Sequence, residues 1–240
     1  MDITFSEKSF PQVKLFVAIP MYGGLCKFNC LQGMIDLSST CITYNIPMTL
    51  HGLVNESLAQ KAKNLCVDAF LKSDSTHFLF IDSDIGFTAK DVLSLLYLVS
   101  SDQEKKYDVL AGPCPRKTIS WEKLKCSSQE YNFIASSRDP FSLTSLVEVS
   151  EIGTGFMMIP RRTFEKFMQD YPKNTYKDAK GKKQFSFFDC AIDPDTKFFM
   201  TEDRLFCRAV RKMGGRVWMA PWLRLIRQGA YPYEESFALS

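Results

Sequence analysis

Residues 78–87 read FLFIDSDIGF, a run of large apolar side chains that ends in two acidic residues and a glycine. A short apolar run bounded by turn-forming residues is typical of a buried strand that stops where the acids begin. Asp82 and Asp84 are two positions apart, on either side of Ser83, so their carboxylates point the same way in an extended segment. Such a pair can hold one hard cation that keeps positions open for phosphate oxygens. It can equally be a turn in which the acids cap backbone amides.

The segments around this stretch alternate between strand and helix patterns. Residues 13–20 (VKLFVAIP) and 108–115 (DVLAGPCP) each look like a short apolar strand followed by a turn. Apolar residues recur at helical spacing over 31–46 and 57–71, and a further helix is predicted over 90–100. This alternation predicts an α/β fold with a mostly parallel, open, Rossmann-like sheet flanked by helices, in which ligands bind beyond the carboxyl ends of the strands.

The second half of the chain is less regular. Strand-like runs occur at 146–152 (LVEVSEI) and 155–160 (GFMMIP), and a helix is expected to begin near Arg161. Residues 119–140 suggest a hairpin or loop, and the lysine-rich stretch over 171–185 is typical of a mobile loop.

Composition restricts the class of protein. The 240 residues are 45% hydrophobic and 24% charged, which excludes a disordered, collagen-like or coiled-coil chain. The net charge of +3 is too small to favour nucleic acid as a partner. No signal-peptide pattern and no run of ~20 apolar residues is present, so we expect no transmembrane segment and a soluble, cytoplasmic protein. The eight cysteines form no CxxC pair, and we expect reduced thiols.

Thr201, Glu202 and Asp203 begin a predicted helix that ends at Gly214 and Gly215. Thr201 is placed to cap the N-terminus, where acids also complement the helix dipole. The apolar stripe of the helix continues back to Glu202, whereas Asp203 lies about 100° around the helix. A carboxylate at this position stays ionised and suits a group that accepts a proton from a substrate hydroxyl. The simpler alternative is a cap with dipole complementation and no chemistry.

Gly153, Thr154 and Gly155 form a second short pattern of interest. Two glycines around a threonine can let the backbone approach a sugar closely. They can equally mark a bulge or a tight turn without a functional role.

The order of these segments resembles the nucleotide-diphospho-sugar glycosyltransferases of the GT-A fold, in the compact form found in bacteria, phages and large algal viruses. The matching segments are AIPMYGG, LAQKAKNLCVDAFL, FLFIDSDIGF, LAGPCPRK, EIGTGFMMIPRRTF and TEDRLFCRAVRKMGGRVW. An acidic DxD pair is a weak signal alone, but DxD, GTGF and TED in this order are fairly specific. The resemblance implies one glycosyltransferase domain over 1–240, with a donor-binding half at about 13–115 and an acceptor and catalytic half at about 116–233.

The resemblance implies a metal-dependent transfer of a sugar from a nucleotide-diphosphate donor, with uridine as the expected base, to a glycan or glycoprotein acceptor. Asp82 and Asp84 would bind Mn²⁺ or Mg²⁺ and, with Ser83, contact the donor diphosphate. The further positions expected to contact the donor are Pro20, Tyr22, Lys63 and Asn64.

The resemblance also implies the catalytic residues. Asp203 would deprotonate the acceptor hydroxyl in an inverting reaction, whereas helical phase favours its neighbour Glu202. A first-turn residue can lean away from the stripe, so we expect Asp203 to be the base. The segment from Gly153 through Thr154 to Gly155 would contact the acceptor.

One position departs from the pattern. Related sequences often carry a late histidine, in a pattern like HxGxYxY, that completes the metal shell. Residues 227–233 of this chain read RQGAYPY, with Arg227 in that place. Arginine cannot ligate a cation, but its fork can pair with phosphate oxygens. Either metal affinity is weak, or Arg227 binds the donor and takes part of the leaving-group charge. Lys63 replaces a usual arginine and loses its bidentate geometry.

Two other functions fit part of the sequence. A haloacid-dehalogenase-like phosphatase would use Asp82 and Asp84 as nucleophile and acid/base, but Gly86 stands where that family has Thr or Val. Its motif also lies near the start of the chain, not a third of the way along. A degenerate, non-catalytic sugar-binding or scaffold module is the other alternative, suggested by Arg227.

Overall fold

The structure of the chain is a computed structural model that describes residues 5–6, 9–117, 131–137, 140–229 and 232–234. The helices are α1 (Phe28–Thr43), α2 (Ala59–Lys72), α3 (Ala89–Ser100), α4 (Arg161–Asp170), α5 (Glu202–Lys212) and the short 3-10 helix η2 (Tyr22–Gly24). The strands are β1 (Leu15–Met21), β2 (Met48–Val54), β3 (His77–Ile81), β4 (Ile85–Gly86), β5 (Val109–Ala111), β6 (Phe133–Ala135), β7 (Val147–Ile152), β8 (Phe156–Pro160), β9 (Thr175–Lys177), β10 (Lys183–Phe185), β11 (Ala191–Ile192), β12 (Phe199–Met200), β13 (Val217–Met219), β14 (Ile226–Gln228) and β15 (Pro232–Glu234).

An eight-stranded sheet in the order β2-β1-β3-β8-β5-β13-β7-β6 forms the centre of the molecule. β1 pairs in parallel with β2 and β3, and β13 pairs in parallel with β5. β8 runs antiparallel between β3 and β5, and β7 runs antiparallel to β13. The predicted α/β fold with a mostly parallel sheet is confirmed. Because β8 comes from the second half of the chain and lies between two strands of the first, both halves share one sheet.

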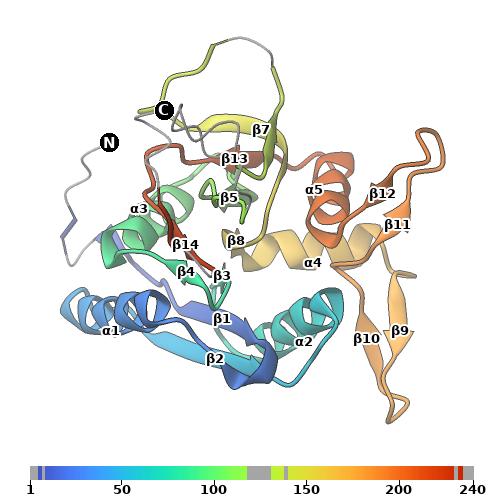
Figure 1. Ribbon diagram of the computed structural model, residues 1–240, viewed down its shortest axis with the longest axis horizontal. Helices are drawn as coiled ribbons and strands as arrows, with labels where there is room; N and C mark the ends of the chain where they lie inside the picture. The colour runs from blue at the N-terminus through green and yellow to red at the C-terminus, as the bar shows by residue number, and fades with distance from the viewer. Residues whose placement is uncertain (1–4, 7–8, 118–130, 138–139, 230–231, 235–240) are drawn as a thin grey trace.

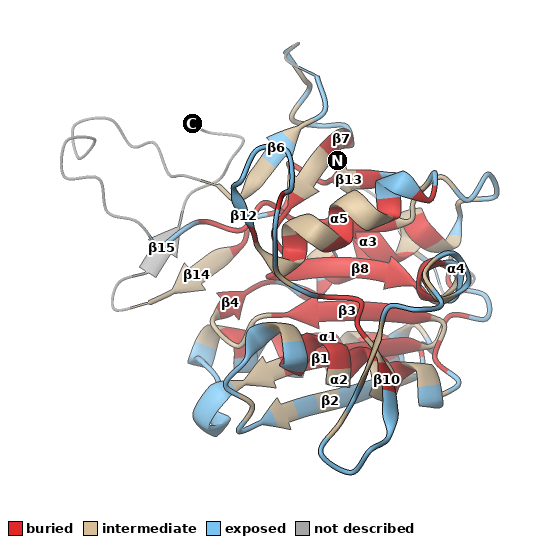
Figure 2. Cartoon of the chain, turned by 90° about the vertical axis from the view of Figure 1, so that its right-hand side faces the viewer, coloured by how far each residue is buried: buried red, intermediate tan, exposed pale blue. Residues whose placement is uncertain are grey.

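Apolar side chains cover both faces of this sheet. Along β1, Leu15 and Val17 join the core beneath α1 and α3, whereas Phe16 and Ala18 join the core beneath α2, α4 and α5. Figure 1 shows the sheet between these two groups of helices. β3 and β8 are buried along their whole length, whereas the edge strand β2 is partly exposed (Figure 2). A strand covered on both faces is continuously apolar, as the run before Asp82 is.

The predicted helices over 57–71 and 90–100 correspond to α2 and α3. Thr88 and Asp91 begin α3 with a capping box, in which each side chain accepts a hydrogen bond from the other's backbone amide. The helix predicted over 31–46 is α1, which begins and ends three residues earlier. Asn45, just beyond its end, has a φ of 53°, a left-handed conformation that stops the helix.

The lysine-rich stretch is a hairpin of β9 and β10 and not the loop expected from its charge. The carboxylate of Asp178 accepts hydrogen bonds from the amides of Lys180 and Lys182 at 2.9 and 2.8 Å, which orders the turn. Of the loop or hairpin predicted over 119–140, residues 119–130 and 138–139 lie outside the described residues. The rest of that region contains β6.

Two other expectations from composition can be compared with the structure. The seven cysteines that the structure describes are all free, which agrees with the predicted reduced thiols. Within the described ranges, every helix is too short or too polar to cross a bilayer.

Phe164 on α4 provides a test of the second core. Its side chain is fully buried, and its ring centroid lies 5.5 Å from that of Phe78 and 5.2 Å from that of Phe187. We expect Phe164→Ala to lower the free energy of unfolding by about 3–5 kcal/mol, because the lost ring leaves a cavity. Urea denaturation measures this. Phe28→Ala, whose side chain is 69% exposed, is the matched control, and equal losses in the two variants would contradict the packing described.

Candidate active site

The acidic pair lies in a tight turn directly after β3. The amide of Asp82 donates to the carbonyl of Gly155 at 2.9 Å, and the amide of Ile85 donates to the carbonyl of Asp82 at 3.0 Å. The carbonyl of Ser83 accepts a hydrogen bond from the amide of Lys27, immediately before α1, at 2.8 Å. The turn is therefore held on one side by the start of β8 and on the other by the start of α1.

Two basic side chains neutralise the acids of this turn. β14 pairs antiparallel with β4 and places Arg227 opposite Ile85 (Figure 1). Arg227 Nη2 donates a hydrogen bond to Asp82 Oδ2, and Arg227 Nε lies 3.4 Å from Asp84 Oδ1. Lys117 Nζ lies 2.5 Å from Asp84 Oδ2. Burial is the largest single influence on Arg227 and would lower its pKa, but the charges of Asp82 and Asp84 and the other groups around it together outweigh burial and raise that pKa, so the guanidinium stays charged.

This arrangement does not fit the predicted Mn²⁺ or Mg²⁺ site. Mg²⁺ and Mn²⁺ are usually held by one or two carboxylates together with waters and substrate phosphates, so an acidic pair can serve only if its oxygens are free to face the cation. In the part of the chain that the structure describes, no three His, Cys, Asp or Glu side chains are grouped so that they could hold a metal. The carboxylates of Asp82 and Asp84 face Arg227 and Lys117 instead, and a guanidinium repels a cation that approaches the same oxygens.

A second ion pair joins α2 to the start of α5. Lys63 is buried, and its Nζ lies 2.6 Å from Glu202 Oε1 and donates a hydrogen bond to Thr154 Oγ1. The Cys190 thiol lies 3.9 Å from Glu202 Oε2. Burial disfavours the charged carboxylate of Glu202, but the charge and hydrogen bond of Lys63 prevail and lower the pKa of Glu202. Glu202 is therefore ionised and already matched by a cation.

Asp203 has a different environment from Glu202. Its side chain is buried, and its Oδ1 accepts hydrogen bonds from the Thr201 hydroxyl and, at 2.8 Å, from the Arg204 amide. Its Oδ2 accepts one longer bond, of 3.3 Å, from Asn132 Nδ2. Among the described residues, no Lys, Arg or His forms an ion pair with Asp203. The hydroxyl of Thr201 thus binds this carboxylate and does not cap α5, contrary to the predicted cap.

The segment from Gly153 to Gly155, between β7 and β8, contacts the charged and polar side chains described above. The amide of Gly153 donates to the carbonyl of Asn132 at 2.9 Å, and a Cβ on Gly153 would lie 2.7 Å from Asn132 Nδ2. A Cβ on Gly155 would lie 3.0 Å from both Arg227 Nη2 and Asp82 Oδ2. Thr154, between the two glycines, binds Lys63. All three residues of the segment are buried, so they hold the charged groups in place, and their contact with an acceptor stays a prediction.

The remaining predicted donor positions lie in two places. Pro20 is in the last part of β1, next to the exposed Tyr22 of η2, at the edge where the parallel strand β3 ends in Asp82. Asn64 is buried, and its side chain binds the backbone of Phe187 and Phe188: the Oδ1 atom accepts from both amides at 2.9 Å. Its Nδ2 donates to the carbonyl of residue 188 at 2.8 Å.

Sequence reasoning did not identify Asn132 or Lys117 as site residues. Asn132 lies within the region predicted only as a hairpin or loop and belongs to no recognisable pattern. Lys117 is the last residue of the segment LAGPCPRK, and this was the available signal, because the turn after a parallel strand lies at the same edge of the sheet as the acids after β3.

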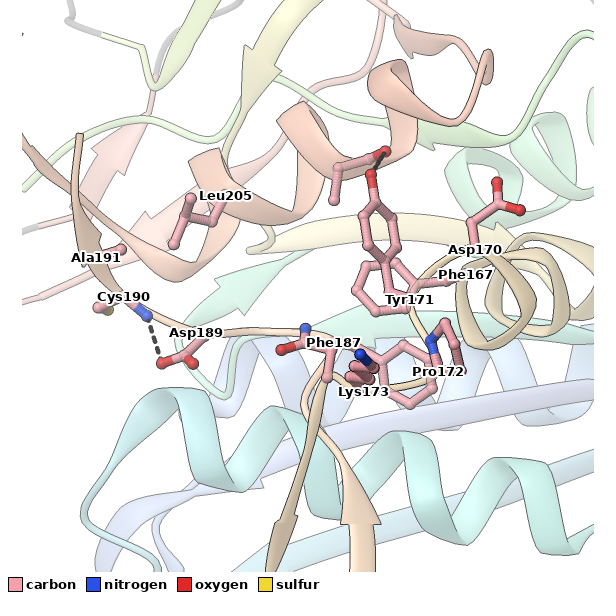
Figure 3. Close-up of a pocket in the computed structure, with 12 residues that line it drawn as sticks. Phe167, Asp170, Tyr171, Pro172, Lys173, Phe187, Asp189, Cys190, Ala191 and Leu205 are labelled. Carbon is pink, nitrogen blue, oxygen red and sulfur yellow. Dashed lines mark hydrogen bonds between the residues drawn. The ribbon is translucent and has the colours of Figure 1, made fainter. Parts of the chain in front are cut away.

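A pocket lies between α4, α5 and the chain over 187–191 (Figure 3). Its volume is about 710 Å³, and Phe167, Tyr171 and Leu205 contribute apolar walls. Cys190 lines this pocket and also approaches Glu202, so the pocket adjoins the second ion pair.

Comparison with solved structures identifies the type of fold. No family model and no curated protein sequence matches the chain. Among solved structures, A197 from STIV is similar over 90% of this chain and 86% of its own, with 18% identity and a TM-score of 0.53. GalNAc-T7, solved with UDP, GalNAc and Mn²⁺, matches more loosely over 91% of this chain and 45% of its own, with 9% identity and a TM-score of 0.47. With the sheet order described above, the likeness to A197 confirms the GT-A-type fold.

The ion pair between Lys63 and Glu202 gives a test of the site's electrostatics. We expect Lys63→Met to lower the free energy of unfolding by about 2–4 kcal/mol, because it leaves the half-buried Glu202 without its cation. Lys63→Met with Glu202→Gln should recover part of this loss. Because the folded pKa of Glu202 is lowered, the pair stabilises the protein above the pKa of an unfolded Glu and less as pH falls through the folded pKa.

Urea denaturation at pH 7 and at pH 4 measures both effects. The wild type should lose more stability between the two pH values than the Glu202→Gln variant does. Additive losses in the double variant, or an identical pH dependence in the wild type and Glu202→Gln, would contradict the pairing.

Asn64→Ala separates a structural role from a donor contact. We expect a loss of about 2–4 kcal/mol in unfolding free energy, because two buried amides and one carbonyl at residues 187–188 lose their partner. Gln32→Ala, at an exposed position of α1, is the control. A stable Asn64→Ala variant with weakened donor binding would instead support direct donor contact.

Proposed function

We propose that the chain is a glycosyltransferase that moves a sugar from a nucleotide-diphospho-sugar donor to a glycan or glycoprotein acceptor. The observation that carries this proposal is the arrangement around the buried segment from Gly153 to Gly155. The charged cluster of Asp82 and Arg227 lies against one end of this segment, and Asp203 is linked to its other end through Asn132. A diphosphate site and a carboxylate base on either side of the sugar are what glycosyl transfer requires.

Asp203 is the catalytic base in this proposal. Glu202 is paired with Lys63 through a charge-assisted hydrogen bond, which makes it a poor proton acceptor. Asp203 has no such cation among the described residues, and its Oδ2 accepts only one long hydrogen bond. The bonds to Oδ1 from Thr201 and Arg204 fix the orientation of the carboxylate. Glu202 and Lys63 then act as a fixed support at the start of α5.

The reaction proposed is a single inverting displacement. Asp203 takes the proton of the acceptor hydroxyl as its oxygen attacks the anomeric carbon of the donor. The bond from that carbon to the diphosphate breaks, and its electron pair leaves on the diphosphate oxygen. Charge grows on this leaving group as the bond breaks, so positive groups placed at the diphosphate accelerate the step.

The donor, the acceptor and the compartment are part of the same proposal. We expect the nucleotide base of the donor to lie beside Pro20 and Tyr22 at the end of β1, and we expect the nucleoside to be uridine. The exposed ring of Tyr22 provides a surface on which a base can stack. Free cysteines throughout the described chain support a reducing, cytoplasmic setting.

Asp203→Asn tests the assignment of the base. In a panel of nucleotide-sugars, mass spectrometry detects slow hydrolysis of the donor, in which water replaces the acceptor. We expect Asp203→Asn to lower the hydrolysis rate of the active donor by about 10²–10⁴-fold, because the amide cannot take the proton. Asp195→Asn, at an exposed position, is the matched control and should retain the wild-type rate.

The same assay separates the alternatives. Absence of both binding and hydrolysis across the panel would contradict the transferase and favour a non-catalytic module. Hydrolysis of a generic aryl phosphate that is lost in Asp82→Asn would favour a phosphatase. Full activity in Asp203→Asn with loss in Glu202→Gln would move the base to Glu202.

A further inference from the structure

The acidic turn after β3 carries its own cations, and this bears on how the proposed glycosyltransferase holds its donor. Asp82 and Asp84 together contribute two negative charges, and Arg227 and Lys117 contribute two positive charges that contact them. The cluster is therefore neutral before any ligand arrives. A metal-binding acidic pair is instead left with an excess of negative charge that a divalent cation then neutralises.

Arg227 is built into this position by its surroundings. Its backbone is fixed by the pairing of β14 with β4, and its side chain is only 18% exposed. Nη1 lies 3.5 Å from the carbonyl of Pro115, and Nη2 lies where a Cβ on Gly155 would come within 3.0 Å. A larger residue in place of Gly155 would push the guanidinium away from Asp82. The arginine therefore occupies a fitted site.

The hydrogen bonding of the cluster is incomplete. Arg227 Nε and Asp84 Oδ1 are buried and face each other at 3.4 Å, but neither makes a hydrogen bond in the described part of the chain. Buried polar atoms are normally satisfied, and a guanidinium offers five donors in a planar fork. Lys117 is about half exposed, on the open side of the same cluster. Nε faces a carboxylate, so the donors left for an anion that bridges the two basic side chains are those of Nη1, which makes only a 3.5 Å bond to the Pro115 carbonyl, and of Lys117.

We propose that Arg227, with Lys117, takes the place of a divalent cation at the donor diphosphate, so that the enzyme binds and cleaves its donor without a metal. Asp82 and Asp84 hold the two cations in position and do not ligate a metal. As the bond between the anomeric carbon and the diphosphate breaks, the electron pair moves to the diphosphate oxygen, and the fork of Arg227 neutralises it. This inference rests on the proposed transferase function.

Binding of UDP and of GDP, measured by calorimetry with excess EDTA and again with Mn²⁺, tests the proposal. We expect the wild type to bind one of them with EDTA present, and Mn²⁺ to change the affinity by less than about threefold. Arg227→Ala should weaken binding by about 10- to 100-fold with EDTA, because charge-assisted bonds to phosphate are lost. Arg227→Lys keeps the charge but loses the planar fork, so its nucleotide affinity should lie between that of the wild type and that of Arg227→Ala. Arg224→Ala, on an exposed residue nearby, is the control.

Mn²⁺ titration followed by electron paramagnetic resonance gives a readout without nucleotide. The wild type should leave the signal of free Mn²⁺ unchanged. Arg227→His removes the guanidinium and adds a nitrogen ligand beside the two carboxylates, so this variant should bind Mn²⁺ and bind the nucleotide only when Mn²⁺ is present.

The outcomes separate this inference from the proposed function. The role proposed for Arg227 would be wrong if the wild type needed Mn²⁺ to bind nucleotide, or if it bound Mn²⁺ in the absence of nucleotide. Either result would still be compatible with the proposed transferase function. No binding of either nucleotide in either condition would overturn both. If Arg227→Ala does not fold, Arg227→Lys and Arg227→His still test the inference. It would be overturned if both variants bound the nucleotide in excess EDTA as tightly as the wild type does.

Discussion

The close approach of charged side chains to the buried segment from Gly153 to Gly155 is the constraint on which the candidate site depends. The guanidinium of Arg227 and the carboxylate of Asp82 lie where a side chain on Gly155 would stand, and Asn132 lies where one on Gly153 would stand. The central strand β8 begins directly after this segment and pairs with β3 and β5. The core of the sheet thereby fixes the distance between groups that come from remote parts of the chain.

Electrostatics distinguishes the four acids of the site. A buried charge is costly unless it is paired, and three of the acids have a cation: Glu202 has Lys63, Asp82 has Arg227, and Asp84 has Lys117. Asp203 is held by hydrogen bonds from a hydroxyl and two nitrogens instead. These hydrogen bonds fix the orientation of the carboxylate, and none of them comes from a charged side chain. This difference, and not helical phase, is the reason we propose Asp203 as the catalytic base.

Several features could be predicted because they depend on local pattern. The run before Asp82 is continuously apolar since β3 is covered on both faces, and the apolar stripes of α2 and α3 are set by nearby residues. The β9–β10 hairpin was missed because its exposed lysines dominate the composition, whereas an aspartate that binds turn amides orders it. The bond between Thr201 and Asp203 was missed because a cap and a carboxylate partner look alike in sequence.

The sequence by itself determined the α/β class, the acids at the end of a buried strand and the acids at the start of a late helix, because periodicity and turn chemistry act over a few residues. Only the tertiary structure decided which charge meets which. Arg227 reaches Asp82 because β14 adds to β4, and Lys63 reaches Glu202 because α2 and α5 cover the same face of the sheet. Such pairings join residues more than a hundred positions apart, and no local pattern encodes them.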